Sequence, residues 1–445
     1  MKNLNLPLMS LTLVLCVLAQ IVCANELLPP PSVIVEDYAV HGQATYTVQS
    51  ANAFAASYAG TNSLSPSGRR ATADFTVSLG AHLWDGAEAW LNPELDQGFG
   101  LNDTLGLAGF SSGEAYKVGR QRPYLRLQRA FIRQTLGLSG VRESIEAGAN
   151  QLSGTRLHDR IVITVGKFNV TDIFDTNQYA HDARGDFLNW SVIDGGAFDY
   201  AADAWGYTVG AAVEWYHSEW VVRGGLMDLS NVPNSAHLEP ALHEFQWLFE
   251  LEHQHQVGDR QGKILVTAFD SRGRMGLLSD ALKLADITGQ TPDVAMVRRY
   301  RGRTGLGLNI EQQLQDDVGA FVRASSAGGN VETYEFTDID RSFVLGVALK
   351  GTRWGRAADT VGCALVTNQI SSSRQQYFAR GGLGILVGDG QLPHAAPERI
   401  LETYYSASPF KHLQLTFDYQ HVANPAYNSD RGPVSIVSLR AHSQF

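Results

Sequence analysis

Apolar and polar residues alternate along most of this chain. Residues 73–83 place apolar side chains at the odd positions and mainly polar ones at the even positions. The same period of two recurs along the chain, at residues 40–48, 207–215, 245–252, 413–420 and 435–445. Alternation of this kind is typical of β-strands that have one apolar and one polar face. The pattern therefore predicts an all-β, antiparallel protein.

Two classes of sheet protein fit such alternation. In a soluble sandwich the polar face meets bulk water, whereas in a transmembrane β-barrel the apolar face meets lipid and the polar face lines a lumen. Strands of about 10 residues cross a bilayer when tilted, and closure removes the unpaired edges that lipid cannot satisfy. Aromatic residues near the strand ends favour the barrel, because such rings form belts at membrane interfaces. In EWYHSEW (214–220) we predict a turn at His217-Ser218 that pairs Trp215 with Trp220.

Membership of the transmembrane β-barrel class constrains the number of strands. About 17 segments between Tyr38 and Phe445 read as strands, but a bacterial barrel needs an even number, so we predict 16. The segments at 138–160 and 353–400 are the least well defined. Long loops are expected at residues 51–70, 93–123, 170–204, 230–243 and 270–303, the last with a short helix in MGLLSDALKLADI (275–287). The glycines of 381–390 suit a strand beside a crowded lumen.

The N-terminal part predicts export. Residues 1–24 have the features of a cleaved signal peptide, and the proline-rich residues 25–36 are expected to form an extended tether before a barrel domain at 37–445. Two of the three cysteines lie in the signal, which leaves Cys363 without a disulfide partner. The net charge of −10 becomes −11 without the signal, whose only charged side chain is Lys2. This balance does not support nucleic-acid binding.

Three long blocks carry a family resemblance. Residues 91–119, 165–216 and 424–445 are similar to the carbohydrate-selective porins of Gram-negative outer membranes, the OprB type. The resemblance covers nearly the whole exported chain, and it implies a 16-stranded barrel, passive diffusion of sugars and no catalysis. It also implies that Phe445 is the terminal signal read by the outer-membrane assembly machinery, although Ser443 stands where an apolar residue is more usual.

A sugar-selective constriction needs charged hydrogen-bonding groups and an aromatic ring on which a sugar stacks. We expect a constriction loop at 170–204 to fold into the lumen. Arg126 lies between the apolar Leu125 and Leu127 and should face inward, whereas Arg129 has the opposite parity unless a bulge intervenes. The candidate lining residues are Glu88, Arg122, Arg126, Arg129, Asn189, Trp190, Asp194 and Asp199.

Other functions remain open at this stage. A porin for other solutes, such as anions attracted by the arginines, fits the same strands, and an outer-membrane barrel enzyme is a weaker alternative. His243, His253 and His255 lack further ligands for zinc, so we expect no metal and no cofactor. Expected partners are carbohydrate solutes, outer-membrane lipid, lipopolysaccharide and the assembly machinery, for either a monomer or a homotrimer. The sequence does not rank one sugar above another.

Overall fold

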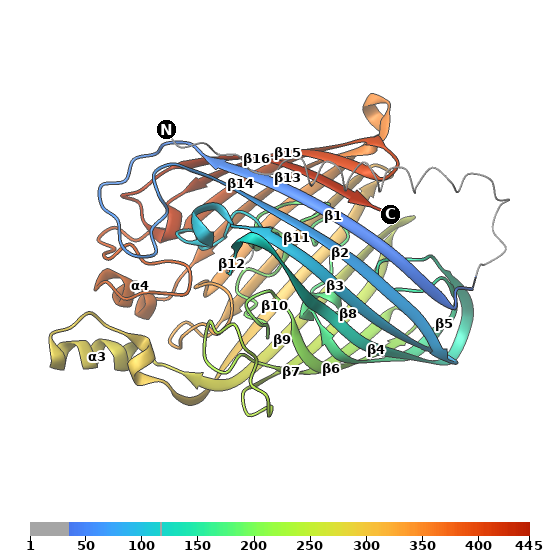
Figure 1. Cartoon of the computed structure of the whole chain (residues 1–445), viewed down its shortest axis with the longest axis horizontal. Helices are drawn as coiled ribbons and strands as arrows, with labels where there is room; N and C mark the ends of the chain where they lie inside the picture. Colours follow the sequence, from blue (N-terminus) through green and yellow to red (C-terminus); the bar gives the residue numbers. More distant parts are fainter. Residues whose placement is uncertain (1–34, 116–117) are drawn as a thin grey trace.

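A computed structural model describes residues 35–115 and 118–445 of the chain. Sixteen antiparallel strands close into one barrel, in which each strand pairs with its neighbours in sequence and the first strand pairs with the last (Figure 1). The predicted 16-stranded barrel is confirmed. The predicted signal peptide and most of the predicted tether lie outside the described residues.

The strands differ in length from 9 to 26 residues. They are β1 (Tyr38–Ala51), β2 (Gly68–Trp84), β3 (Ala87–Gly98), β4 (Arg120–Ile145), β5 (Gly154–Phe168), β6 (Thr208–His217), β7 (Trp220–Asp228), β8 (Phe245–Val257), β9 (Arg260–Met275), β10 (Arg299–Gln315), β11 (Val318–Ala327), β12 (Arg341–Gly351), β13 (Arg356–Gln369), β14 (Glu398–Phe410), β15 (Leu413–Ala423) and β16 (Val434–Gln444).

Short helices lie in the connections between the strands. The α-helices are α2 (Trp190–Ile193), α3 (Leu278–Thr288) and α4 (Ser372–Ala379), and the 3₁₀ helices are η1 (Leu101–Thr104), η2 (Val170–Asp172), η3 (Val294–Val297), η4 (Thr352–Trp354) and η5 (Pro425–Tyr427). The helix predicted within 275–287 is confirmed as α3. No helix in the described part of the chain has the length and apolarity to cross a membrane.

The barrel wall exposes apolar side chains on its outer face and buries polar side chains on its inner face, which is the reverse of the distribution in a soluble protein. On β8, the outward side chains of Trp247 and Phe249 are 54% and 52% exposed, whereas the inward Glu250 is fully buried. Apolar side chains on the outer face need lipid around them, and polar side chains on the inner face need partners in the lumen. The alternation in the sequence therefore reflects a lipid-facing outer side and a polar inner side of each strand.

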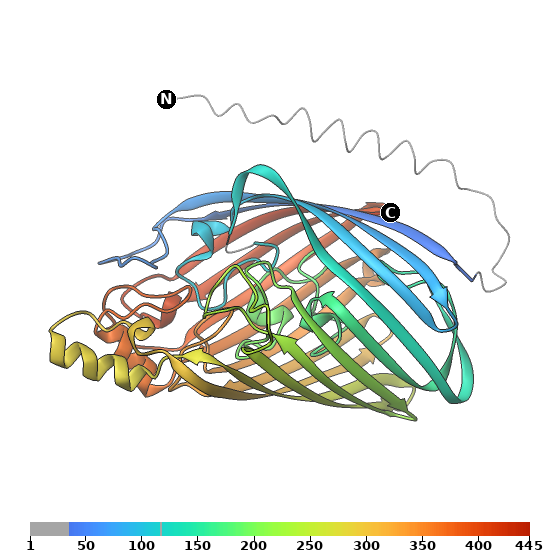
Figure 2. The same ribbon diagram turned by 60° about the horizontal axis from the view of Figure 1, so that its bottom comes forward.

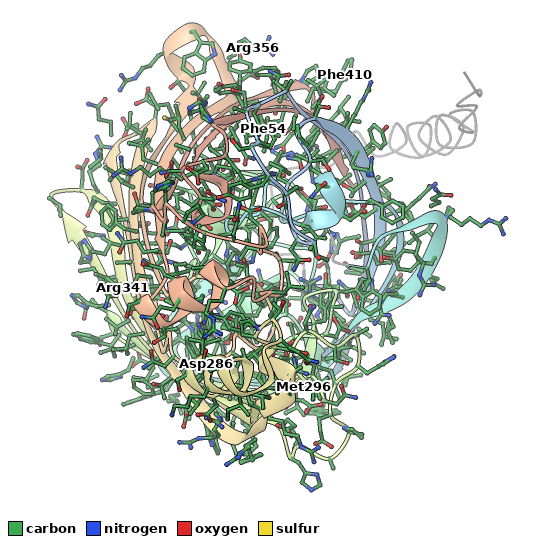
Figure 3. The ribbon with its side chains drawn as sticks, turned by 90° about the vertical axis from the view of Figure 1, so that its left-hand side faces the viewer. Phe54, Asp286, Met296, Arg341, Arg356 and Phe410 are labelled. Atoms are coloured by element: carbon green, nitrogen blue, oxygen red, sulfur yellow. The ribbon has the colours of Figure 1, made fainter. Side chains whose placement is uncertain are left out.

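Loop length separates the two ends of the barrel. Both described ends of the chain and the short turns lie at one end, and the long loops with α3 and α4 lie at the other (Figures 1 and 3). In outer-membrane barrels, short turns face the periplasm and long loops face the outside. The loop predicted at 93–123 is shorter than expected, because β3 continues through Pro93 to Gly98 and β4 begins at Arg120.

Two local predictions are wrong. The turn between β6 and β7 is Ser218-Glu219, so His217 pairs with Trp220 and Trp215 pairs with Val222. The turn therefore lies one residue later than predicted, and its first residue, Ser218, takes a positive φ of 51°. The glycine-rich stretch 381–390 lies in the loop between α4 and β14 and is not a strand.

The β5–β6 connection, residues 169–207, folds into the lumen and is called the lumen loop below (Figure 2). Wall side chains hold its backbone from several sides of the barrel. Glu250 on β8 accepts from the Asp175 N–H at 2.7 Å, Glu311 on β10 accepts from the Gln178 N–H at 2.7 Å, and Glu402 on β14 accepts from the Leu188 N–H at 2.5 Å. The polar inner face of the barrel thus supplies the partners that a buried loop backbone requires.

Phe445 lies at the seam between the first and last strands. Its carbonyl accepts from the Gly42 N–H at 2.7 Å, and its N–H donates to the Gly42 carbonyl at 2.9 Å. The ring covers Gly42, where an added Cβ would collide with the ring carbon Cε2. Phe445 therefore extends the seam by one residue pair.

We expect deletion of Phe445 to lower the yield of folded barrel in the outer membrane without lowering synthesis. The deletion removes two seam hydrogen bonds and the ring over Gly42. Heat-modifiable mobility on gels measures the folded fraction, and Phe445→Tyr, which keeps the ring and the backbone, is the matched control. Equal folded yields for the deletion and the wild type would contradict the prediction.

Candidate pore constriction

A cavity of about 320 Å³ lies inside the barrel, between the lumen loop, the loop at 99–119 and the inner face of the wall. Its volume is within the range of about 300–1,000 Å³ that is typical of small-molecule sites. Four carboxylates and two guanidinium groups line it: Glu114, Asp172, Asp182 and Asp194, with Arg129 and Arg184. This cavity is the candidate constriction of the pore.

Arg129 reaches the cavity because of a bulge in β4. Asn92 on β3 pairs with Arg129, whereas the adjacent Pro93 pairs with Leu127, so one extra residue of β4 is inserted between them. A bulge of this kind re-aims the side chains beside it. The Arg129 guanidinium donates to both oxygens of Asp172, with Nε–Oδ2 and Nη2–Oδ1 distances of 2.7 and 2.6 Å.

Arg184 of the lumen loop reaches the barrel wall at β2 and β3. Its Nη2 lies 3.0 Å from Asp74 on β2 and 3.1 Å from Glu94 on β3, and its Nε lies 3.3 Å from Glu114 in the loop at 99–119. Burial raises the pKa of Glu114 well above its usual range, and Arg184 opposes that shift. One arginine therefore holds two loops against two strands beside the cavity.

An aromatic stack borders the same cavity. Trp190 is stacked with Phe110 at a centroid distance of 5.2 Å and with Phe336 at 5.3 Å. Tyr200 adds a fourth ring, 4.2 Å from Phe336. Because Trp190 lies between two rings, it contributes an edge to the cavity and is not an open platform for a sugar.

Three of the eight candidate lining residues border the cavity: Arg129, Trp190 and Asp194. Arg126 faces inward as predicted but does not line the cavity. Its Nη2 lies 3.2 Å from Asp203, and its guanidinium carbon lies 3.3 Å from the centroid of Trp205. Trp205 itself lines the cavity and so stands between Arg126 and the open space.

The four remaining candidates have other positions. Arg122 is exposed near the loop end of β4. Glu88 lies 2.7 Å from Arg133 and accepts from the Leu152 N–H at 3.1 Å, which fastens the loop at 146–153.

Asn189 and Asp199 are buried structural groups. The Asn189 side chain donates to the Gly109 carbonyl and to Gln420, both at 3.0 Å. Asp199 lies 2.7 Å from Arg303 and accepts from the Tyr334 N–H at 2.7 Å. Both side chains form hydrogen bonds or ion pairs with other buried polar groups, and neither lines the cavity.

Sequence reasoning missed Asp172, Arg184, Glu114 and Tyr207 as lining residues. Asp172 could have been found as a capping residue, because it follows strand β5 and its carboxylate accepts from the Asn169 N–H at 3.0 Å. Nothing in the local pattern around Arg184 indicates that its partners come from β2, β3 and a different loop.

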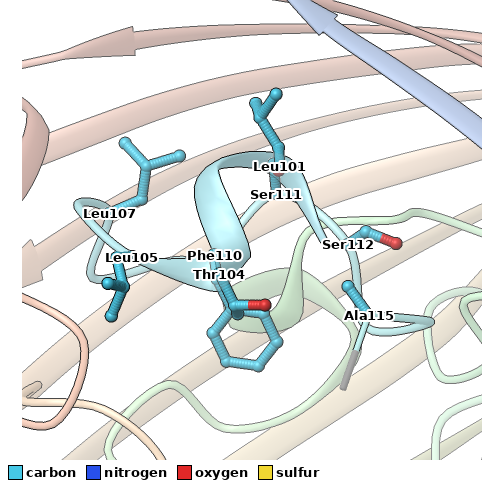
Figure 4. A pocket seen from close by; sticks show the side chains of 8 residues that line it. All are labelled: Leu101, Thr104, Leu105, Leu107, Phe110, Ser111, Ser112 and Ala115. Atoms are coloured by element: carbon cyan, nitrogen blue, oxygen red, sulfur yellow. The ribbon is translucent and has the colours of Figure 1, made fainter. Parts of the chain in front are cut away.

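A second cavity of about 10 Å³ lies beside η1 under the loop at 99–119, lined by Leu101, Thr104, Phe110 and their neighbours (Figure 4). It has room for about one water molecule and none for a sugar. The larger cavity is therefore the candidate path for a solute.

Asp194 is expected to make the stability of the protein depend on pH. Burial, followed by repulsion from Asp175, raises the pKa of Asp194 to about 7, and its Oδ2 accepts from the Tyr200 hydroxyl at 3.2 Å. A raised carboxyl pKa contributes stability at low pH. This stability is lost as the pH rises from about 4 to about 7, at a rate of about 1.4 kcal/mol for each step of one in pH.

Asp194→Asn should therefore raise the melting temperature at pH 8 and change it little at pH 4. Thermal unfolding in detergent at the two pH values measures this difference. Asp259→Asn, at a carboxylate 87% exposed, is the control. A stabilisation of equal size at both pH values would show that Asp194 does not titrate in this range.

The lipid-facing wall, the closed sheet and the inserted lumen loop together define a porin. The sequence model of the carbohydrate-selective porin family, OprB, matches residues 61–445, and the chain belongs to this family. Its place is the outer membrane of a Gram-negative bacterium. The family and the fold are those of channels rather than enzymes.

Solved structures agree on the fold. The high-pH structure of Pseudomonas putida OprB has a TM-score of 0.68 and 14% sequence identity, over 92% of this chain and 94% of that chain. The low-pH structure of the same porin has a TM-score of 0.50 and 11% identity, over 92% and 93%. No curated protein is significantly similar to this sequence.

Proposed function

We propose that the protein lets carbohydrates, either monosaccharides or small oligosaccharides, diffuse passively through the barrel. The observation that supports this is the cavity of about 320 Å³, which combines paired charged groups with aromatic side chains. A sugar offers hydroxyl groups around its rim and C–H faces above and below. Guanidinium and carboxylate groups bind the hydroxyls, and aromatic rings contact the C–H faces.

The charges of the cavity favour uncharged sugars over anions. Arg129 is paired with Asp172, and Arg184 is paired with Asp74, Glu94 and Glu114. Asp172 and Asp182 balance the two lining arginines even when Glu114 and Asp194 are protonated, so an anion gains no net attraction there. Paired groups still donate to and accept from the hydroxyls of a neutral solute.

Liposome swelling tests the proposal. Proteoliposomes should swell faster in glucose or maltose than in sodium gluconate of comparable size, and protein-free liposomes should not swell at this rate. Faster swelling in gluconate would indicate an anion porin. Equal rates for all solutes of one size would indicate a non-selective pore.

A further inference from the structure

The periplasmic end of the cavity differs in chemistry from the part of the constriction that is lined by Arg129, Asp172 and Arg184. Its lining there contains polar side chains that include no Asp, Glu, Lys or Arg: His41 and Gln43 on β1, Ser78 on β2, Asn92 on β3 and Asn150 in the loop at 146–153. These five residues are called the exit wall. Charged pairs adjoin these five residues but are not among them: Arg129–Asp172 lies beside Asn92, and Asp74, which is paired with Arg184, accepts from the Gln43 amide.

Strand register brings most of the exit wall together. His41 pairs with Ser78 across β1 and β2. The Asn92 side chain on β3 donates to the Ser78 hydroxyl at 3.0 Å. Three adjacent strands therefore present a row of polar side chains to the lumen.

The loop at 146–153, which joins β4 and β5, contributes Asn150 to the lining of the cavity. Arg133 donates to the Asn150 carbonyl at 2.8 Å, and Glu88 accepts from the Leu152 N–H at 3.1 Å. Ser153 donates its N–H to the Glu36 carboxylate at 2.8 Å, just before β1. Backbone contacts fix the loop, so the Asn150 side chain is not needed to hold it.

Three atoms of the exit wall have no hydrogen-bond partner among the described residues: His41 Nε2, Asn92 Oδ1 and Asn150 Oδ1. All three atoms are buried in residues that line the cavity, and Asn92 as a whole is 1% exposed. Buried amide oxygens without partners are costly unless a solute or solvent hydroxyl donates to them.

We propose that the exit wall is a second binding site for sugar, which takes one uncharged pyranose ring through its hydroxyl groups. This inference rests on the proposed function. Each sugar hydroxyl both donates and accepts, which suits amide oxygens and an imidazole nitrogen, whereas an ion would find no opposite charge on these five side chains. A sugar that leaves Arg129 exchanges charged partners for neutral ones before it enters the periplasm. Successive sites of moderate affinity allow a pore to bind its solute and still release it.

Single-channel recording with glucose added to one side tests the site. Current noise gives the residence time of glucose that enters from the periplasmic or from the extracellular side. We expect Asn150→Ala and Asn92→Ala to shorten the residence of periplasmic-side glucose about fivefold, the loss of about one hydrogen bond. Residence of extracellular-side glucose, which meets the charged constriction first, should change less than twofold.

Thr47→Ala is the matched control. Thr47 faces inward on β1 and is 2% exposed, and its hydroxyl also lacks a partner among the described residues, but it does not line the cavity. Asn150 lies in a loop, so its variant decides the question if Asn92→Ala folds poorly.

The outcomes separate this inference from the proposed function. Glucose noise from both sides that is unchanged in both variants would overturn the exit site and leave the sugar channel intact. A wild-type channel with no glucose noise from either side would overturn both. A side-dependent effect of equal size in Thr47→Ala would also overturn the exit site.

Discussion

Single channels of Arg129→Ala are expected to conduct small ions better than the wild type, with stronger cation selectivity and about tenfold weaker block by glucose. Arg129 borders the cavity and donates twice to Asp172. Its removal widens the space and leaves the Asp172 carboxylate without its main cation. A charge-assisted hydrogen bond contributes about 1.5–3 kcal/mol, and about 1.4 kcal/mol corresponds to a tenfold change in affinity.

Arg126→Ala is the matched control for this experiment. Arg126 is on the same strand and faces the same lumen, but Asp203 and Trp205 cover it. We expect its channels to keep glucose block within about twofold of the wild type, well below the tenfold effect at Arg129. A larger loss of block in Arg126→Ala than in Arg129→Ala would reverse the assignment of the constriction.

Arg323→Met is expected to unfasten the lumen loop. Arg323 on β11 is 1% exposed, and its guanidinium donates to the carbonyls of Ala180, Val192 and Asp175 and lies 3.5 Å from the Asp175 carboxylate. Removal of one partner from a buried ion pair costs about 3–5 kcal/mol. The melting temperature should fall clearly, and the open-channel current should become larger and noisier as the loop leaves its position.

Arg353→Met controls for the loss of an arginine as such. Arg353 is 48% exposed at a short turn, where it lies 2.6 Å from Asp317. A solvent-exposed ion pair contributes little to stability, so both stability and current should be close to wild type. An Arg323→Met channel with wild-type noise would mean that the carboxylates Glu250, Glu311 and Glu402 hold the loop without it.

Local pattern predicts the wall of this protein well, because each strand carries the signature of lipid on one face. The same pattern misplaces the turn at Ser218-Glu219, because a period of two does not determine which two residues of a hairpin form the turn. Arg129 shows a second case in which the alternation pattern alone gives the wrong orientation. Its parity is wrong for the lumen, and only the pairing of Asn92 and Pro93 with β4 reveals the bulge that re-aims it.

The interior of the lumen is less predictable. Asn189 and Asp199 are of the polar residue types expected in a pore lining. Their side chains instead contact groups of the loops and the wall, and they do not line the cavity. A loop inside a barrel uses polar side chains both to satisfy its own packing and to face the solute. The sequence does not distinguish these two uses, since the partners come from strands far away in the chain.

The order of the strands has a consequence for how the barrel forms. Every strand pairs with its neighbours in sequence, apart from the pairing of β1 with β16. Fifteen hairpin contacts are therefore of low contact order and form by local chain closure, whereas the seam joins residues about 400 positions apart. Until that seam forms, the sheet has two open edges that lipid cannot satisfy. Pairing of β1 with β16, from Gly42–Phe445 to Ala51–Ile436, is thus the step at which a growing sheet becomes a self-sufficient membrane protein.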